Sequence, residues 1–290
     1  MIYLESFRLP DAEAETDFFL HITRTCYNNF YPFQIFPEMG LTRLDFEPVT
    51  ILCGGNGSGK TTLLNLLAES VGAFRASPYN RSSFWEDYLR LCHAKLAPGA
   101  KTALKKAKII TSDDVFDYLL NVRTLNSGID SKREELINEY TSAKYAHFQM
   151  RSMDDYDQLK KVAAARRGTG SAYVKNQLMK NIRNGSNGES AFEYFTREIQ
   201  EDTLYLLDEP ENSLSPDRQL ELLQFLEDSA RFYHCQFVIS THSPFLLALR
   251  DARIYDLDTR PVRTARWTEI PGVRTYFDFF DAHRDEFERK

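Results

Sequence analysis

The chain has 290 residues, 42% of them hydrophobic, and a formal net charge of −6. This length can bury one large core, and the acidic average argues against a surface that coats nucleic acid indiscriminately. The sequence shows no apolar run near the ~18 residues of a membrane span, no secretory signal and no paired cysteines of a zinc motif. We therefore expect a globular cytoplasmic protein that does not enter a membrane.

Hydrophobic patterning predicts strands and helices in alternation. Strands are expected at residues 2–8 and 41–46, and the apolar run 48–53 predicts a buried strand. Leucines at helical spacing over residues 60–71 then predict a helix. The first part of the chain therefore reads as strand, glycine-rich turn and helix.

The middle of the chain differs from both ends. Residues 75–185 are charged, rich in tyrosine and helical in pattern, so we expect a helical lobe inserted into the core. Strands return at 203–207, 236–240 and 253–257, with an amphipathic helix over 217–233. Strands that alternate with helices imply an α/β fold with a mainly parallel sheet.

The turn before the helix at 60–71 fits the phosphate-binding pattern G-x-x-x-x-G-K-[ST]. Glycines let backbone N–H groups curl around phosphates, and the helix N-terminus adds positive charge. Lys60 is expected to reach the β- and γ-phosphates, and the Thr61 hydroxyl to bind Mg²⁺. A glycine-rich turn without function is the alternative. The expected nucleotide-binding residues are Gly54, Gly55, Asn56, Gly57, Ser58, Gly59, Lys60, Thr61 and Thr62.

Two adjacent acids, Asp208 and Glu209, end the strand predicted at 203–207. Ligands bind at the carboxyl ends of strands in open α/β sheets. Asp208 can hold Mg²⁺, and Glu209 can orient and deprotonate an attacking water. A solvated strand end without function is the alternative.

A lone histidine, His242, follows the strand predicted at 236–240. Isolated histidines are often structural, but this one is expected at the same sheet edge as the glycine-rich turn. There it can hydrogen-bond the γ-phosphate or the attacking water. We therefore interpret Lys60, Glu209 and His242 as the catalytic residues.

Residues 186–190 precede a predicted helix and read Ser-Asn-Gly-Glu-Ser. Ser186 and Glu189 have the spacing of a helix capping box. Ser186 and Gly188 at a helix N-terminus also make an anion site, so both roles are compatible.

Between residues 159 and 183 the chain has seven basic residues and no acidic one. This stretch predicts either a nucleic-acid contact or a solvated helical face. Its basic residues are Lys160, Lys161, Arg166, Arg167, Lys175, Lys180 and Arg183.

Taken in order, these motifs resemble those of ABC-type ATPases: Walker A at 54–61, the signature at 186–190, Walker B with its glutamate at 204–210, and the switch histidine His242. The run Asp-Glu-Pro-Glu-Asn-Ser-Leu-Ser-Pro resembles the RecF, SMC and OLD-like branch. The chain is most similar to small bacterial AAA/ABC ATPases whose relatives include Septu-type and retron-associated antiphage ATPases.

The resemblance implies one ABC-type ATPase domain over residues 1–290, with an N-terminal antiparallel β element, which uses ATP and Mg²⁺. It further implies a head-to-tail dimer in which Ser186 and Gly188 contact the γ-phosphate held by Lys60 of the other subunit. The D-loop would be residues 212–215. The chain shows no clear Q-loop glutamine, and Asp113 is the candidate for an acid near Mg²⁺ in its place.

Three functions stay open at this point. The first is an ATPase that regulates or powers a protein partner in DNA maintenance or antiphage defence, with nucleic acid bound through residues 160–183. The second is the nucleotide-binding subunit of a transporter. The third is an ATP-gated scaffold for a toxin or nuclease partner.

Overall fold

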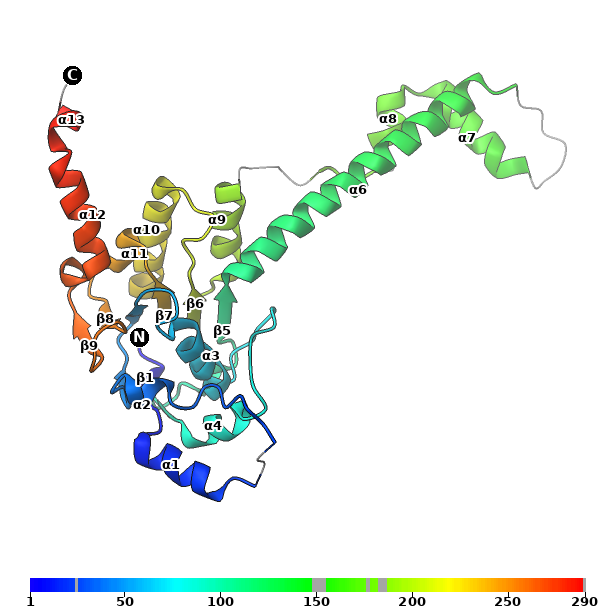
Figure 1. Ribbon diagram of the computed structural model, residues 1–290. Coiled ribbons are helices and arrows are strands. Elements are labelled where there is room, and N and C mark those ends of the chain that lie inside the picture. The colour runs from blue at the N-terminus through cyan, green and yellow to red at the C-terminus, as the bar shows by residue number, and fades with distance from the viewer. Residues whose placement is uncertain (24–25, 148–154, 176–177, 182–186, 289–290) are drawn as a thin grey trace. The chain divides into compact units, whose positions relative to one another are not determined.

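The computed structural model describes residues 1–23, 26–147, 155–175, 178–181 and 187–288 (Figure 1). The chain forms two compact units. The first unit joins Met1–Val115 to Asn187–Lys290, and the second is Phe116–Ser186. The motifs at 54–61, 204–210 and 242 all belong to the first unit.

A six-stranded sheet lies at the centre of the first unit, in the order β5-β6-β7-β3-β8-β9 (Figure 1). All neighbours in it are parallel except β8 and β9. Every residue of β3, β6 and β7 is buried, which explains why these strands read as continuous apolar runs. The mainly parallel α/β sheet is confirmed. Its strands are β3 (Val49–Cys53), β5 (Lys108–Thr111), β6 (Leu204–Asp208), β7 (Gln236–Thr241), β8 (Arg253–Asp256) and β9 (Arg263–Ala265).

A second, three-stranded sheet is antiparallel and has the order β2-β1-β4. It consists of β1 (Leu4–Arg8), β2 (Arg43–Asp45) and β4 (His93–Leu96). The expected N-terminal antiparallel element is therefore confirmed.

The region expected to form the helical lobe, residues 75–185, contains the two strands β4 and β5. Strand β4 has the sequence His-Ala-Lys-Leu and no fully buried residue, so it shows no hydrophobic alternation. Strand β5 is only four residues long and follows several lysines. Both strands are fixed by pairing with β1 and β6 rather than by local pattern.

Helices cover the sheets of the first unit. Aromatic residues of its N-terminal part pack into the core, where Trp85, Tyr88 and Phe84 are fully buried. The helices are α1 (Ala12–His21), α2 (Ile35–Glu38), α3 (Lys60–Val71), α4 (Trp85–Leu91), α5 (Lys101–Leu104), α9 (Asn187–Glu198), α10 (Pro216–Phe232), α11 (Pro244–Leu247), the 3₁₀ helix η2 (Trp267–Glu269), α12 (Pro271–Ala282) and α13 (Arg284–Glu288).

The second unit is helical. Helix α6 (Ser112–Tyr145) begins in the first unit and continues into the second, which also contains α7 (Tyr156–Arg167) and α8 (Gly170–Lys175). Leu136, Tyr173 and Val174 form a small core within it. No helix among the described residues is both long and apolar enough to cross a membrane.

One buried amide side chain ties the two sheets of the first unit together. Gln236, the first residue of β7, is fully buried. Its Oε1 accepts from the backbone N–H groups of Tyr3 and Leu4, both at 2.8 Å, and its Nε2 donates to the Leu4 carbonyl at 2.9 Å. Buried backbone groups need such partners, so Gln236 fixes the antiparallel sheet against the parallel one.

Replacing Gln236 with leucine should therefore lower the free energy of unfolding by about 3 kcal/mol, because it leaves buried backbone groups unpaired. Urea denaturation measures this loss. Gln224 is the matched control, since it lies exposed on α10 and bonds only Asp228 among the described residues. Gln224→Leu should change stability by less than about 0.5 kcal/mol. Equal effects of the two substitutions would contradict the role assigned to Gln236.

Candidate nucleotide-binding site

The glycine-rich turn connects β3 to α3 and wraps around the side chain of Lys60. Gly57 and Gly59 have φ values of 82° and 86°, in the left-handed region that favours glycine. The buried Lys60 ammonium donates to the carbonyls of Gly54 at 2.8 Å and Gly55 at 3.0 Å. The positive charge is thus held inside the loop, at the N-terminus of α3.

The loop has the polar groups that a phosphate requires. Gly59 is the N-cap residue of α3 and has no side chain that could accept a hydrogen bond. The first N–H groups of the helix are therefore not satisfied by a capping side chain. The Ser58 hydroxyl is buried without a hydrogen-bond partner in the described structure. A Cβ at Gly54 would lie 2.5 Å from that hydroxyl, so the loop tolerates only glycine there. These residues fit an anionic ligand at the helix N-terminus.

Asp258 is a loop residue that the sequence analysis missed. Its two carboxylate oxygens accept from the Gly55 N–H at 2.8 and 3.1 Å, and its own N–H donates to Asp256 at 3.0 Å. Asp258 follows β8, so it lies at the same sheet edge as the loop. The signal in the sequence that could have identified Asp258 is its position directly after the strand predicted at 253–257.

Asp208 ends β6 and is buried beside the start of α3. The Thr61 hydroxyl donates to its Oδ1 at 3.2 Å. Burial raises the pKa of Asp208, and the hydrogen bond from Thr61 partly opposes that rise. A hydroxyl and a carboxylate held this close are the oxygen ligands that fit Mg²⁺.

Glu209 is brought close to both other residues interpreted as catalytic. Its Oε1 lies 3.8 Å from the Lys60 Nζ and 3.8 Å from the His242 Nδ1. The Asn212 amide donates to its Oε2 at 3.2 Å, and its N–H donates to the Ser240 carbonyl at 2.8 Å. The backbone of Glu209 has a φ of 48°, a conformation uncommon outside glycine that concentrates at functional sites.

A third acid, Glu211, orders the loop that carries His242. Its buried Oε1 accepts from the Thr241 hydroxyl at 2.6 Å and from the N–H groups of His242 at 3.0 Å and Ser243 at 3.2 Å. The His242 ring itself is half exposed. The sequence analysis missed Glu211, although it stands only two residues after Glu209.

A cavity of about 350 Å³ lies beside Thr61 and Asp208 and also reaches Asp113. Asp113 is in the first turn of α6, within the first unit. The next acid, Asp114, is occupied differently, because it accepts from the Thr111 N–H at 2.8 Å and from the Ser77 hydroxyl at 2.5 Å. The other residues around the cavity are Tyr31, Asn65, Arg75, Pro78, Tyr79, Asn80, Thr111 and Ser112.

Of the signature residues, Ser186 lies outside the described residues, while Gly188 and Glu189 lie in the first turn of α9. A Cβ at Gly188 would meet the Ser213 carbonyl at 3.5 Å, so this turn packs against the loop expected to be the D-loop. Glu189 pairs with Arg218 at 3.4 Å. The hydroxyl of Thr62, in α3, bonds the Tyr31 hydroxyl at 2.8 Å.

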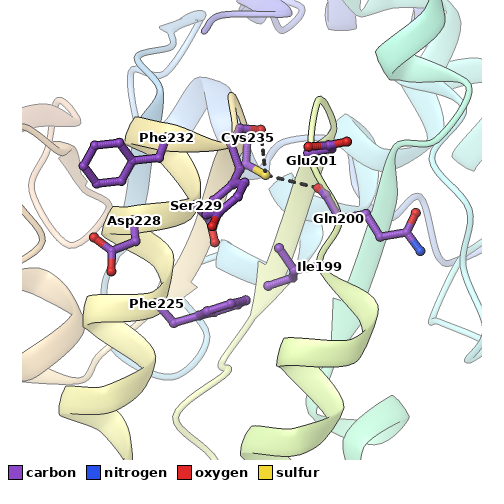
Figure 2. Close-up of a pocket in the computed structure, with 9 residues that line it drawn as sticks. Ile199, Gln200, Glu201, Phe225, Asp228, Ser229, Phe232 and Cys235 are labelled. Atoms are coloured by element: carbon purple, nitrogen blue, oxygen red, sulfur yellow. Dashed lines mark hydrogen bonds between the residues drawn. The ribbon is translucent and has the colours of Figure 1, made fainter.

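A different cavity, of about 510 Å³, opens where α9 ends and β7 begins (Figure 2). Figure 2 shows Phe225, Asp228 and Phe232 of α10 along one side and Ile199 with Glu201 along the other. Because it lies at the amino ends of β6 and β7, it is at the opposite sheet edge from Lys60 and Glu209. It is therefore separate from the nucleotide site.

Residues 183–248, which carry Asp208, Glu209 and His242, match the family described as "AAA domain, putative AbiEii toxin, Type IV TA system". The match supports an ATPase of the AAA/ABC type. It spans less than a quarter of the chain. No curated protein matches the sequence.

Solved structures with a similar course of the chain include the Smc head domain of Pyrococcus furiosus bound to the C-terminal domain of ScpA. The two sequences are 12% identical, the match covers 98% of this chain and 100% of the Smc chain, and the TM-score is 0.44. The protein cbiO1 of Clostridium perfringens, part of the ABC transporter complex cbiONQ, is 14% identical, covers 84% and 88%, and has a TM-score of 0.36.

The buried carboxylate of Asp208 leads to a prediction about stability. Because burial raises its pKa, the ionised form costs stability at neutral pH, and that cost fades as pH falls through the raised pKa. Asp208→Asn should therefore stabilise the nucleotide-free protein at pH 7 by about 1 kcal/mol, and less at pH 5. Thermal unfolding at both pH values measures the difference.

We expect MgATP to stabilise the wild type by about 2.7 kcal/mol at a nucleotide concentration of 100 Kd, and the same variant to lose most of this stabilisation. Asp17→Asn is the control, since it removes one charge at an exposed position on α1. An Asp208→Asn protein that is less stable than wild type without nucleotide would disprove the argument from burial.

Proposed function

We propose that this protein is a cytoplasmic ATPase that binds MgATP and hydrolyses it at the interface of a head-to-tail dimer. The observation that carries the proposal is the meeting of Lys60, Glu209 and His242 at one sheet edge. These residues follow the ends of three different strands. Packing of the core alone does not require polar side chains to meet at this place. The Thr61–Asp208 hydrogen bond supports the proposal that these two residues hold the metal.

Each residue has a role that its geometry permits. Lys60 and the backbone N–H groups of the loop bind phosphate oxygens. Thr61 and Asp208 would hold Mg²⁺, and Asp113 lines the same cavity. The metal would supply positive charge that neutralises the phosphates. Glu209 orients the attacking water and accepts its proton, while His242 donates a hydrogen bond to the γ-phosphate or contacts that water.

The second subunit completes the site in this proposal. Ser186 and Gly188 of one subunit contact the γ-phosphate held by Lys60 of the other. The packing of the first turn of α9 against Ser213 supports this arrangement, because it keeps the signature turn and residues 212–215 on one surface. A symmetric pair would then contain two identical composite sites.

The wider role that we propose is to regulate or power a protein partner in DNA maintenance or antiphage defence. Nucleic acid would bind through residues 160–183, part of which lies outside the described residues. Lys160, Lys161, Arg166 and Arg167 are exposed on α7, which favours this contact. However, Lys161 is engaged by Glu139 of the same unit.

A transporter subunit would use the same ATP chemistry but would need a membrane-embedded partner. Sedimentation with membranes only when a permease is coexpressed would support that alternative. A scaffold that merely senses ATP has no need for a general base, so Glu209 speaks against it.

Changing Glu209 to glutamine should lower kcat for ATP hydrolysis by at least about 100-fold, because the amide cannot accept the proton from water. The variant should still bind ATP and accumulate as an ATP-dependent dimer, seen by light scattering. Phosphate release is followed in parallel. Glu193→Gln, an exposed change on α9, is the control and should behave as wild type. Unchanged hydrolysis by Glu209→Gln would refute the assigned base.

Mixing two inactive variants tests the head-to-tail arrangement. Lys60→Ala and Gly188→Asp should each be inactive alone, because every site of either homodimer contains one defect. In a mixed dimer one site contains both defects and the other contains none. A one-to-one mixture should therefore recover about a quarter of the wild-type rate, since half the dimers are mixed and one of two sites is intact. No recovery would argue against a shared site.

A further inference from the structure

The C-terminal helices α12 and α13 expose a group of aromatic rings that the proposed ATPase site does not use. Figure 1 shows these helices as consecutive red segments of the first unit. Each ring is more than half exposed, which amounts to roughly 100 Å² per ring and ~500 Å² in total. The largest exposed apolar patch of a typical monomer is of about this size and is often functional. The rings are those of Tyr276, Phe277, Phe279, Phe280 and Phe287.

Their spacing is that of a helix-pairing seam. Val273, Tyr276, Phe280, His283 and Phe287 follow one another at intervals of three, four, three and four residues. This is the repeat of the a and d positions in a left-handed coiled coil. Val273 is buried in its own unit, whereas Tyr276, Phe280 and Phe287 are exposed. A seam of exposed positions therefore begins just after Val273.

The seam continues across the break between the two helices, because the rings of Phe280 and Phe287 lie with their centroids 6.1 Å apart. Helix α12 ends at Ala282 and α13 begins at Arg284, so only His283 lies between them. The His283 ring packs against Phe279, with centroids 4.7 Å apart, and its Nδ1 lies 2.9 Å from the Glu286 carboxylate. His283 thus keeps its ring within the aromatic group.

We propose that the seam pairs with the same seam of a second copy of this chain, as two antiparallel helices. In a twofold dimer both subunits use the same surface. The seam therefore meets a seam of equal length and equal spacing. With the flanking rings of Phe277 and Phe279 also covered, the five rings of each copy bury roughly 1,000 Å² in total, the lower limit for a specific interface. The expected pair is therefore weak and concentration-dependent.

The antiparallel direction follows from the charges and the ring positions. Opposed helix dipoles attract side by side, whereas parallel ones repel. An antiparallel overlap sets Tyr276 against Phe287 of the second copy and Arg284 beside its Phe277. Arg284 is exposed and pairs with Asp281, and its planar guanidinium can also cover a ring. Arg274 already lies 5.2 Å from the centroid of Phe277 in its own chain.

Sedimentation velocity of the Lys60→Ala protein without nucleotide tests the pairing apart from any ATP-dependent dimer. We expect a reversible dimer that Phe280→Glu weakens by at least about 30-fold. Thr275→Glu adds the same charge at an exposed position off the seam and should leave the dimer unchanged. Far-UV circular dichroism checks that each variant is folded, as expected for exposed positions.

Cross-linking tests the direction of the pair in a Cys26→Ser background, where the remaining cysteines are buried. With a short bismaleimide, the double variant Tyr276→Cys and Phe287→Cys should join two copies, while either single variant should not. Efficient cross-linking by the single variants would indicate parallel helices and overturn the proposal. A monomer at all concentrations, a dimer indifferent to Phe280→Glu, or a monomer that instead binds phosphatidylglycerol vesicles through the stripe would overturn it as well.

Discussion

The site depends on one constraint: a fully buried strand, β3, must turn directly into α3 through a loop that encloses the Lys60 ammonium. Burial fixes β3 between β7 and β8, and the parallel register sets Cys53 opposite Thr241. Because β7 also pairs in parallel with β6, Asp208 lies opposite Ser240. Parallel pairing therefore brings the Lys60 loop, both acids and His242 together at the carboxyl edge of the sheet, although they are far apart in the sequence.

The sequence predicted those parts of the fold and site that have a local signature. The Lys60 loop, the three central strands and the Asp208–Glu209 pair could be read because a buried strand is an apolar run and a phosphate loop needs glycines. The rest depends on tertiary contacts. Strands β4 and β5 are short, flanked by charge and held by pairing partners far along the chain. Glu211 and Asp258 act by accepting backbone N–H groups, and no spacing rule shows which amides a carboxylate will reach.

The site contains two features that cost stability, and the surrounding structure has to offset this cost. Asp208 is buried with a raised pKa, and Glu209 adopts a left-handed backbone conformation. Glu211 orders the His242 loop from one side, and Gln236 fixes the other end of β7 to the antiparallel sheet. Strand β7 is thus held at both ends. A rigid strand lets the site tolerate a charge and a backbone angle that would cost stability in a looser setting.

The burial of β3 also determines how reactive the protein is toward thiol reagents. Cys53, its last residue, adjoins the phosphate loop, and burial raises the pKa of its thiol to about 12. Since the thiolate is the reactive form, Cys53 stays protonated and unreactive at pH 7. Cys92 and Cys235 are buried as well, which leaves Cys26 as the exposed thiol of the described chain. A thiol-alkylating reagent that inhibits the protein at neutral pH therefore acts through Cys26, or reports that the buried core has opened.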